Sequence, residues 1–366
     1  MSGTDRSTPW TVSVPGRVNL MGDHTDYNRG LVLPMAIARW CEIAATSNDD
    51  GVVRARSAQY DGVVEVSLRS DVDPRLVEPA WGRFVAGAIA ALRDEDALED
   101  HGVDLVISST VPPGAGLSSS SALAVALTLV LSSADRTLDV PVIARTALEA
   151  EVRATAVPGG LMDQLAVLAG RRDAALLIDF GAEPPAYRPV ALPPGAAVLV
   201  AHSGMSRTLA GSEYGNRRAE CEAIAARLGL ASLRDATLDQ VLGEPRGRHV
   251  VSENARVHAM ADACEAGDIA QMGGLMLESH ASLRDEYEVS TPELDALVHA
   301  FVAAGASGAR LTGAGFGGCV VAVSERERAE RVLADATTRY RETTRREGPS
   351  FVARAVDGAL VAISNG

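Results

Sequence analysis

Short runs of alternating hydrophobic and polar residues predict strands in the first part of the chain. Trp10–Val14 and Arg17–Met21 have this pattern, and the chain becomes apolar again at Leu31–Ile37 after a dense polar stretch. Val52–Val66 contains two alternating runs separated by Asp61-Gly62, a pair that favours the turn of a β-hairpin. This part of the chain is therefore expected to be rich in strands around a polar insert.

Helical and strand patterns alternate over the rest of the chain. Hydrophobic periodicity predicts helices at 81–92, 122–131, 142–154 and 163–170, and strands at 104–108, 174–179, 197–202, 320–323 and 351–356. Long acidic helices are expected after the strand at 197–202. A proline-rich stretch, Glu183–Gly195, interrupts the pattern, so we predict one domain at 1–190 and a second at 191–366.

Composition narrows the class of protein. The chain has 366 residues, which predicts two domains at roughly 150 residues per domain. Its formal net charge of −14 makes it a poor binder of nucleic acid or of an anionic membrane. All 34 basic residues are arginine, so there is no lysine for a Walker A loop, a Schiff base or a general base. Any phosphate must therefore be bound by backbone amides, arginine or a metal ion.

The cysteines and the apolar runs favour a cytoplasmic protein. Four cysteines are spread along the chain without a C-x-x-C pair, which predicts thiols in a reducing compartment. The polar segment Met1–Pro9 lacks the apolar core of a signal peptide. The longest apolar run, Ala122–Leu131, is about half a membrane span. We expect a cytoplasmic location and no membrane contact.

Glycine and serine residues gather at Gly114–Ser121, directly before the apolar run. Backbone amides at the start of a helix bind anions without a lysine, with help from the helix dipole. Serine hydroxyls there can reach phosphate oxygens or Mg²⁺. The alternative is a serine-rich helix cap that binds no ligand.

A second polar cluster occupies Gly16–Asn28, with apolar segments on both sides. Asp23, His24 and Asp26 lie close together in it. Carboxylates and amides that accept and donate in pairs suit the vicinal hydroxyls of a sugar. A zinc or manganese site made by the same three residues is one alternative, and a solvated loop is the other.

Two further segments contain glycine and carry candidate chemistry. Asp163 follows Pro158-Gly159-Gly160 and is either the cap of the next helix or a carboxylate aimed into a cleft. Gly308–Cys319 (GARLTGAGFGGC) leads into a strand. We interpret it as a turn that approaches the glycine-serine loop closely, without a role for any of its side chains.

Three of these segments together resemble one family of small-molecule kinases. Gly16–Ile37 (GRVNLMGDHTDYNRGLVLPMAI) looks like the galactokinase signature. Pro113–Ala122 is similar to the phosphate loop shared by galactokinase, homoserine kinase, mevalonate kinase and phosphomevalonate kinase. Gly308–Cys319 resembles the third motif of that group. The resemblance covers nearly the whole chain, with the motifs in the family's order.

The resemblance implies an α+β fold of two domains with the active site in the cleft between them. The N-terminal domain would contain a mixed sheet with helices, and the C-terminal domain a ferredoxin-like antiparallel sheet with helices. The cofactors would be ATP and Mg²⁺, and the partner a small-molecule sugar. We expect a monomer, with a weak dimer as the alternative.

Roles for individual residues also follow from the resemblance. Asp163 matches the catalytic carboxylate, and Arg17 matches its charged partner. Ser120 and Glu151 match magnesium ligands, and Trp81 falls where the family places an aromatic side chain beside adenine. The phosphates would lie along Gly114, Ala115, Gly116, Leu117, Ser118, Ser119 and Ser120. The sugar would contact Asp23, His24, Thr25, Asp26, Gly160 and Tyr214.

The implied reaction is ATP-dependent phosphorylation of galactose at its anomeric C1 hydroxyl, the first committed step of galactose catabolism. The family's sugar motif normally reads Glu-His-Thr-Asp, whereas this chain has Asp23 at the first position. The family's glutamate reaches the C6 hydroxyl, and an aspartate is shorter by about 1.5 Å. The alternatives are therefore an anomeric kinase for galacturonate, arabinose or N-acetylgalactosamine, or a sugar and ATP sensor without turnover.

Overall fold

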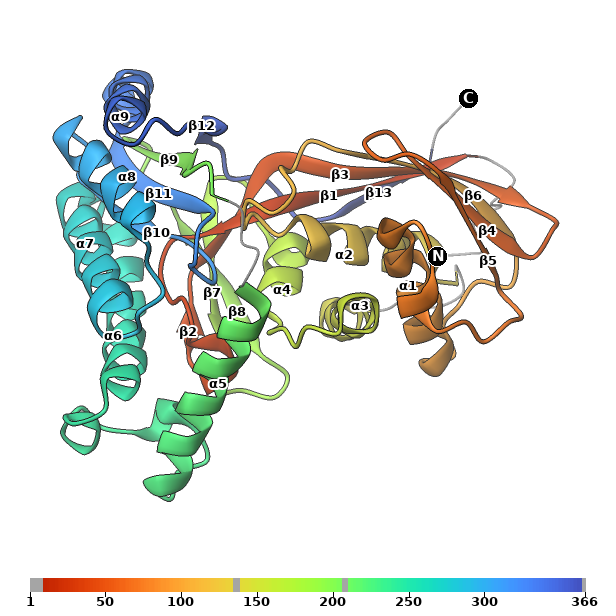
Figure 1. Cartoon of the computed structure of the whole chain (residues 1–366), viewed down its shortest axis with the longest axis horizontal. Helices are drawn as coiled ribbons and strands as arrows, with labels where there is room; N and C mark the ends of the chain where they lie inside the picture. Colours follow the sequence, from red (N-terminus) through yellow and green to blue (C-terminus); the bar gives the residue numbers. More distant parts are fainter. Residues whose placement is uncertain (1–8, 134–138, 206–209, 364–366) are drawn as a thin grey trace.

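A computed structural model of the chain describes residues 9–133, 139–205 and 210–363, so residues 1–8 of the polar N-terminal segment lie outside it. The strands in these residues form three sheets, against which the helices pack (Figure 1). The strands are β1 (Trp10–Asn19), β2 (Leu31–Val32), β3 (Pro34–Asn48), β4 (Val52–Ser57), β5 (Val63–Ser67), β6 (Gly102–Ser109), β7 (Ala174–Asp179), β8 (Ala186–Ala191), β9 (Ala196–His202), β10 (Gly308–Leu311), β11 (Cys319–Glu325), β12 (Ser350–Ala353) and β13 (Leu360–Ile363). The α-helices are α1 (Arg83–Asp94), α2 (Ser119–Leu131), α3 (Val140–Thr155), α4 (Met162–Ala169), α5 (Ala210–Arg227), α6 (Pro245–Ala266), α7 (Ile269–Asp285), α8 (Pro292–Ala303) and α9 (Ala329–Thr344).

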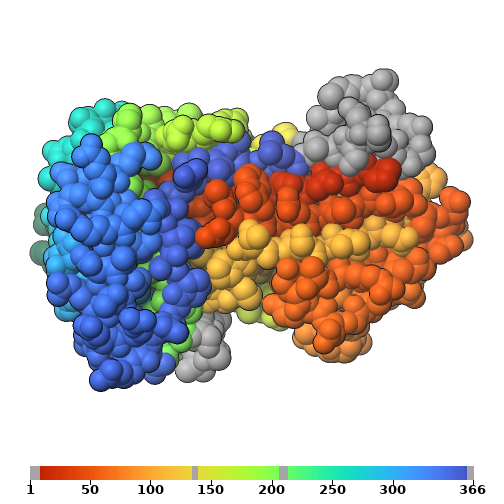
Figure 2. All heavy atoms as spheres, turned by 90° about the horizontal axis from the view of Figure 1, so that it is seen from above, coloured from red at the N-terminus to blue at the C-terminus, as the bar shows by residue number. Residues whose placement is uncertain are grey.

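The N-terminal half is built on a mixed six-stranded sheet in the order β13-β1-β3-β6-β4-β5. The β4–β6 pair is parallel and the other pairs are antiparallel. Trp10, Val12 and Val14 alternate along β1 and are buried in one core with residues of α1 to α4, because successive side chains of a strand point to opposite faces. Helices α1 to α4 lie on this side of the sheet (Figure 1), and the view from above shows red to orange atoms of the first part of the chain at the surface of the opposite side (Figure 2).

The C-terminal half contains an antiparallel four-stranded sheet in the order β10-β11-β9-β12. Along the chain, β9 is followed by helices, then β10, β11, α9 and β12, which is the order of a ferredoxin-like unit. Leu199 and Ala201 of β9 pack in the core that contains α8 and α9. Val198 and Val200, on the opposite face, share a core with Leu20 of the N-terminal half. The expected α+β architecture with these two sheets is confirmed.

Some strands were not expected from the sequence pattern. The proline-rich stretch at 183–195 contains β8, which pairs with β7 at the edge of the sheet β2-β7-β8. An edge strand accommodates Pro189 because one of its sides needs no hydrogen bond. At the end of the chain, β13 pairs with β1 and so returns to the sheet of the N-terminal half. A domain boundary near residue 190 stays a prediction. By its position in the sequence β13 falls in the second predicted domain, but it pairs with a strand of the first.

Two expectations about the chemistry of the chain can be compared with the structure directly. All four cysteines are buried, and none is joined in a disulfide within the residues described. In the same residues, no helix combines the length and the apolar character needed to cross a membrane.

Candidate active site

A cavity of about 330 Å³ brings together the polar segments that are far apart in the sequence. Its walls come from β1, the loop before β2, the first residues of α2 and α4, α3, α5 and the turn after β10. The lining residues include Arg17, Asp23, His24, Asp26, Ser120, Ser121, Glu151, Gly160, Asp163, Tyr214, Gly313 and Ala314. The motifs of both halves of the chain therefore meet at one site.

The carboxylate of Asp163 is held by three donors. Arg17 donates from Nε to Oδ1 and from Nη2 to Oδ2, at 2.7 Å in both cases. Ser118 Oγ donates to Oδ2 at 2.6 Å. This two-pronged contact fixes the plane of the carboxylate. Asp163 lies in the first turn of α4, whose N-cap residue is Leu161, so of the two alternatives the capping role is wrong. The positive end of the helix dipole stabilises an anionic side chain at this position.

The glycine-serine loop joins α2 at Ser118, which has a φ of +61° and makes no side-chain capping bond. Ser118 thus occupies the cap position of α2, but its hydroxyl donates to Asp163 and not to the helix. Ala115 and Leu117 are buried and anchor the loop in the core. The Gly116 carbonyl accepts a hydrogen bond from Arg17 Nη1 at 2.6 Å. The loop consequently connects the start of α2 to the charged pair.

Glu151 on α3 faces the first residues of α2. Its Oε2 accepts hydrogen bonds from Ser121 Oγ and Gln164 Nε2, both at 2.9 Å. Burial raises the pKa of Glu151, and hydrogen bonds from Ser120 and Ser121 act against this shift. Within the described residues, Gln164 Oε1 is buried without a partner. A carboxylate, serine hydroxyls and an unpaired carbonyl oxygen are the hard donors that Mg²⁺ prefers, so these residues fit that ion.

Asp26 borders the cavity directly beside Gly160. A Cβ atom on Gly160 would lie 1.8 Å from Asp26 Oδ2, so a larger residue at position 160 would displace the Asp26 carboxylate. Burial raises the pKa of Asp26 to about 6, and the negative charge of Asp163 acts in the same direction. Asp26 and Asp163 therefore bring two carboxyl groups to the cavity, one from the segment before β2 and one from the start of α4.

His24 uses both of its ring nitrogens inside the protein. Nε2 lies 3.2 Å from the Ala314 carbonyl oxygen, which can only accept, so Nε2 carries a proton. Burial lowers the pKa of His24 to about 3, so the ring is neutral at pH 7 and Nδ1 accepts from the Tyr27 hydroxyl at 2.8 Å. Tyr27 in turn accepts from Tyr287 at 2.8 Å, and Tyr287 accepts from the thiol of Cys221 at 3.0 Å. The Ala314 carbonyl thus sets the direction of the whole chain of hydrogen bonds.

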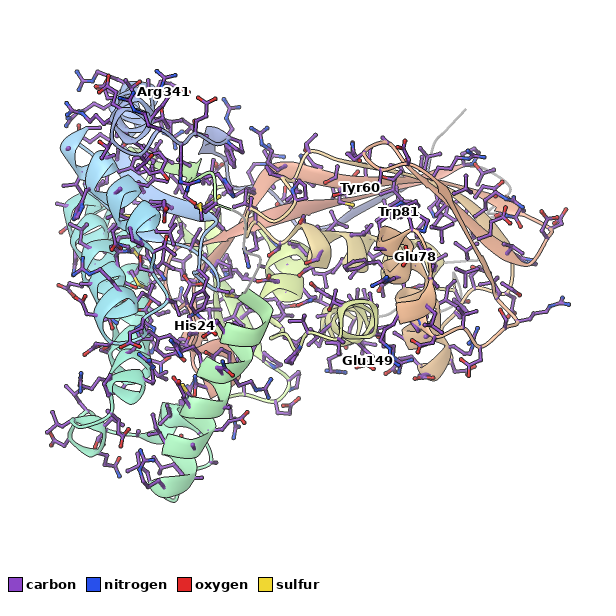
Figure 3. The ribbon with its side chains drawn as sticks, in the orientation of Figure 1. His24, Tyr60, Glu78, Trp81, Glu149 and Arg341 are labelled. Carbon is purple, nitrogen blue, oxygen red and sulfur yellow. The ribbon has the colours of Figure 1, made fainter. Side chains whose placement is uncertain are left out.

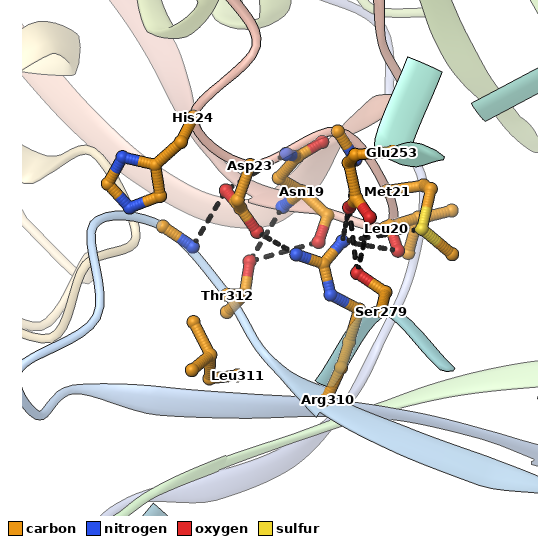
Figure 4. Close-up of polar contacts among 12 residues, drawn as sticks. Asn19, Leu20, Met21, Asp23, His24, Glu253, Ser279, Arg310, Leu311 and Thr312 are labelled. Atoms are coloured by element: carbon orange, nitrogen blue, oxygen red, sulfur yellow. Dashed lines mark hydrogen bonds and ion pairs between the residues drawn. The ribbon is translucent and has the colours of Figure 1, made fainter. Parts of the chain in front are cut away.

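Two other residues of the predicted sugar motif are also bound internally. Thr25 is fully buried, and its Oγ1 contacts the carbonyls of Gly22 and Leu31 at 2.8 and 2.6 Å. It closes the turn of the motif and does not line the cavity. Asp23 borders the cavity with only 1% of its surface exposed, because its carboxylate is turned toward Arg310 (Figure 4). The alternative of a zinc or manganese site is wrong, since the described residues contain no group of three metal-binding side chains.

Sequence reasoning missed the layer of residues behind this motif. Glu253 of α6 accepts a hydrogen bond from the Gly22 amide at 3.0 Å, and the ring of His249 contacts the Asp23 carbonyl at 3.1 Å. One signal was available, because Glu253 stands in the apolar stripe of α6 between Val250 and Val257. A charged residue in such a stripe indicates a buried partner.

A second cavity, of about 580 Å³, adjoins the first at Ser120, which lines both. Its walls include Trp81, Tyr60 and Phe84. Figure 3 shows Tyr60 and Trp81 together in the N-terminal half, on the far side of α2 from His24. Aromatic and apolar walls of this kind suit a flat ring such as adenine.

Comparisons with known proteins identify the family. The galactokinase galactose-binding signature matches residues 3–47, the N-terminal domain of GHMP kinases matches 83–171, and the C-terminal domain of GHMP kinases matches 260–342. A curated relative named galactokinase, from Roseiflexus sp. (strain RS-1), is 45% identical over 364 residues, covering 95% of this chain and 91% of that protein. The chain belongs to the galactokinase family.

Solved structures agree with this membership. The galactokinase of Lactococcus lactis, crystallised with galactose, superposes with a TM-score of 0.88 at 29% identity and covers 97% of this chain and 96% of its own. The mevalonate kinase of Methanococcus jannaschii has a TM-score of 0.69 at 17% identity, with coverage of 95% and 98%, and shares the fold. The resemblance drawn from the three motifs is confirmed.

Proposed function

We propose that this member of the galactokinase family transfers the γ-phosphate of ATP to the C1 hydroxyl of galactose. The observation that carries the proposal is the position of Asp163, oriented by Arg17 and Ser118 in a cavity shared with Asp26. A sugar in this cavity and a nucleotide in the aromatic-walled cavity would meet at Ser120. Phosphoryl transfer depends mainly on such positioning and on neutralising charge.

In the proposed reaction, the C1 hydroxyl oxygen bonds to the γ-phosphorus while the bond from that phosphorus to the bridging oxygen of ADP breaks. The carboxylate of Asp163 accepts the hydroxyl proton. Arg17 and Ser118 hold that carboxylate toward the cavity through bonds of 2.6–2.7 Å. Backbone amides at the start of α2, together with its dipole, stabilise the phosphates in the absence of any lysine.

Ser120 and Glu151 are the residues we propose as magnesium ligands, with Ser121 and Gln164 beside them. The ion would supply positive charge that neutralises the phosphate oxygens. We also propose a cytoplasmic location, which the four buried cysteines without a disulfide support. A monomer, with a weak dimer as the alternative, and a domain boundary near residue 190 remain part of the proposal.

The experiment that tests this function measures ADP release from ATP and Mg²⁺ with galactose, galacturonate, arabinose, N-acetylgalactosamine and glucose. We expect galactose to have by far the largest kcat/KM. Another sugar with a larger kcat/KM would replace galactose as the substrate. Sugar binding without turnover of any of the five would instead support a sensor.

A further inference from the structure

A buried cluster of charged side chains lies directly behind the sugar-motif loop (Figure 4). Arg310 and Glu253 are fully buried, and Asp23 is 1% exposed. Arg310 contacts Asp23 closely through Nη2, and its Nη1 lies 3.5 Å from Glu253. Because buried charges are strongly destabilising without partners, these three side chains depend on one another.

The carboxylate of Asp23 has partners at both oxygens. Oδ1 accepts from Asn19 Nδ2 at 3.0 Å and from the Gly313 amide at 3.1 Å. Oδ2 accepts from Arg310. Figure 4 shows Asn19 of β1 and Arg310 of β10 converging on this carboxylate. Asp23 therefore joins two motifs of the site to each other.

The same cluster makes hydrogen bonds with the backbone just before Asp23. Arg310 Nη1 donates to the Leu20 carbonyl at 3.1 Å, and Glu253 accepts from the Gly22 amide at 3.0 Å. Glu253 is itself held by Ser279 Oγ and by Arg256 Nε, the latter at 2.7 Å. Burial acts to raise the pKa of Glu253, but the positive charges of Arg256 and Arg310 outweigh it and lower that pKa. Glu253 is consequently an anion that fixes the loop.

We propose that Asp23 and Arg310 are positioning residues that hold the sugar-motif loop, and that the carboxylate of Asp23 is not a ligand for the sugar. Asp23 also borders the cavity, but both of its carboxylate oxygens are bound inside the wall, so the sugar hydroxyls are bound instead by other lining residues, among them Asp26 and Tyr214. This inference rests on the proposed function. The proposal also explains why an aspartate occurs at this position. Its short side chain contacts the Arg310 guanidinium and stays buried in the cavity wall.

The test compares galactose with its 2-deoxy, 3-deoxy, 4-deoxy and 6-deoxy forms in the wild type, Asp23→Asn and Arg310→Met. Displacement of the loop affects every sugar alike, so we expect each variant to raise KM for the sugar by about 10- to 100-fold. For one variant, the ratio of its KM to the wild-type KM should be the same for all five sugars to within about threefold. KM for ATP should change by less than about twofold. The proposal would be overturned if Asp23→Asn raised KM for galactose but left KM for one deoxy sugar unchanged. That result would show that Asp23 binds the hydroxyl which this sugar lacks.

Arg310→Met removes the partner of Asp23 without changing the acid itself, and it gives the same comparison if Asp23→Asn does not fold. The pair is tested further with the double variant Asp23→Asn/Arg310→Met. If Asp23 acts through Arg310, the double variant should raise KM for the sugar no more than the worse single variant does. A rise in KM equal to the product of the two single-variant rises would overturn the proposal.

Arg284→Lys, at an exposed pair with Asp285, is the matched control. Failure of the wild type to phosphorylate galactose would refute the proposed function alone, because the same comparison can be made with dissociation constants for the sugars.

Discussion

At the scale of single residues, Asp163 is the group on which we propose that turnover depends, because Arg17 and Ser118 hold its carboxylate in one orientation. Asp163→Asn preserves the shape of the side chain and removes its basicity. We expect kcat to fall at least about 100-fold, the scale for a positioned acid or base, with little change in the dissociation constant for galactose. Steady-state kinetics and calorimetric titration measure the two quantities.

Asp285→Asn is the control for this variant, since Asp285 pairs with Arg284 on the surface of α7. It should leave both quantities unchanged. Turnover of Asp163→Asn near the wild-type rate would remove Asp163 from its proposed role.

Asp26 links the acidity of the site to the stability of the protein. Its pKa in the folded protein is about 6, above the ordinary value of 3.8, so the folded state binds the proton more tightly than the unfolded state does. The resulting stabilisation is complete below about pH 4 and is lost as the pH rises through about 6. At pH 8 the ionised Asp26 therefore destabilises the folded protein.

Asp26→Asn should accordingly raise the free energy of unfolding at pH 8 by about 1–3 kcal/mol while abolishing galactose binding. The gain should shrink as the pH approaches 4. Melting temperatures measured from pH 4 to pH 8 without sugar test this dependence. A variant less stable than the wild type at pH 8 would contradict it.

At the scale of an element, helix α3 has two faces with different functions. Glu151 faces the start of α2, whereas Glu149, two residues earlier, is on the outer face, where it pairs with Arg153 (Figure 3). Residues two apart on a helix point in nearly opposite directions because each turn contains 3.6 residues. The helix thus presents one carboxylate to the proposed magnesium site and one to solvent.

Glu151→Gln should raise the Mg²⁺ concentration needed for half-maximal activity by at least about tenfold, because a neutral amide binds the ion more weakly than a carboxylate does. Glu149→Gln makes the same chemical change on the other face and should have no effect. Initial rates over a magnesium titration at fixed ATP provide the measurement. Equal responses of the two variants would exclude Glu151 as a ligand.

At the scale of the whole molecule, two cavities of different character adjoin at Ser120. The acidic cavity is lined from both halves of the chain, whereas the aromatic-walled cavity is lined by residues 41–123. This arrangement separates the two proposed binding functions in space, with the reacting groups meeting between them.

Substitutions in the two cavities should therefore change different Michaelis constants. Trp81→Ala should raise KM for ATP by about tenfold, since stacking and burial of an aromatic ring contribute on this scale, and should leave KM for galactose unchanged. Tyr214→Ala should have the reverse effect. Each variant is the control for the other, and an equal change in both constants would argue against two separate sites.

Local patterns were sufficient to predict many of the elements and the chemistry of the motifs. Asp61-Gly62 lies between β4 and β5, and the apolar run at 122–131 lies within α2, because turn preferences and burial periodicity act between near neighbours. The lack of lysine likewise limits how phosphate can be bound, whatever the fold. The three motifs, taken together, were enough to place the chain in its family.

Contacts between distant segments were decided only by the tertiary structure. Arg310 and Asp23 are 287 positions apart, and the sequence around either residue does not predict that they pair. The pairing of β13 with β1 is non-local in the same way, and Pro189 obscured β8 because its tolerance depends on an edge position. Such pairs form because buried charges and strand edges must find partners wherever packing brings them, and packing is a property of the whole fold.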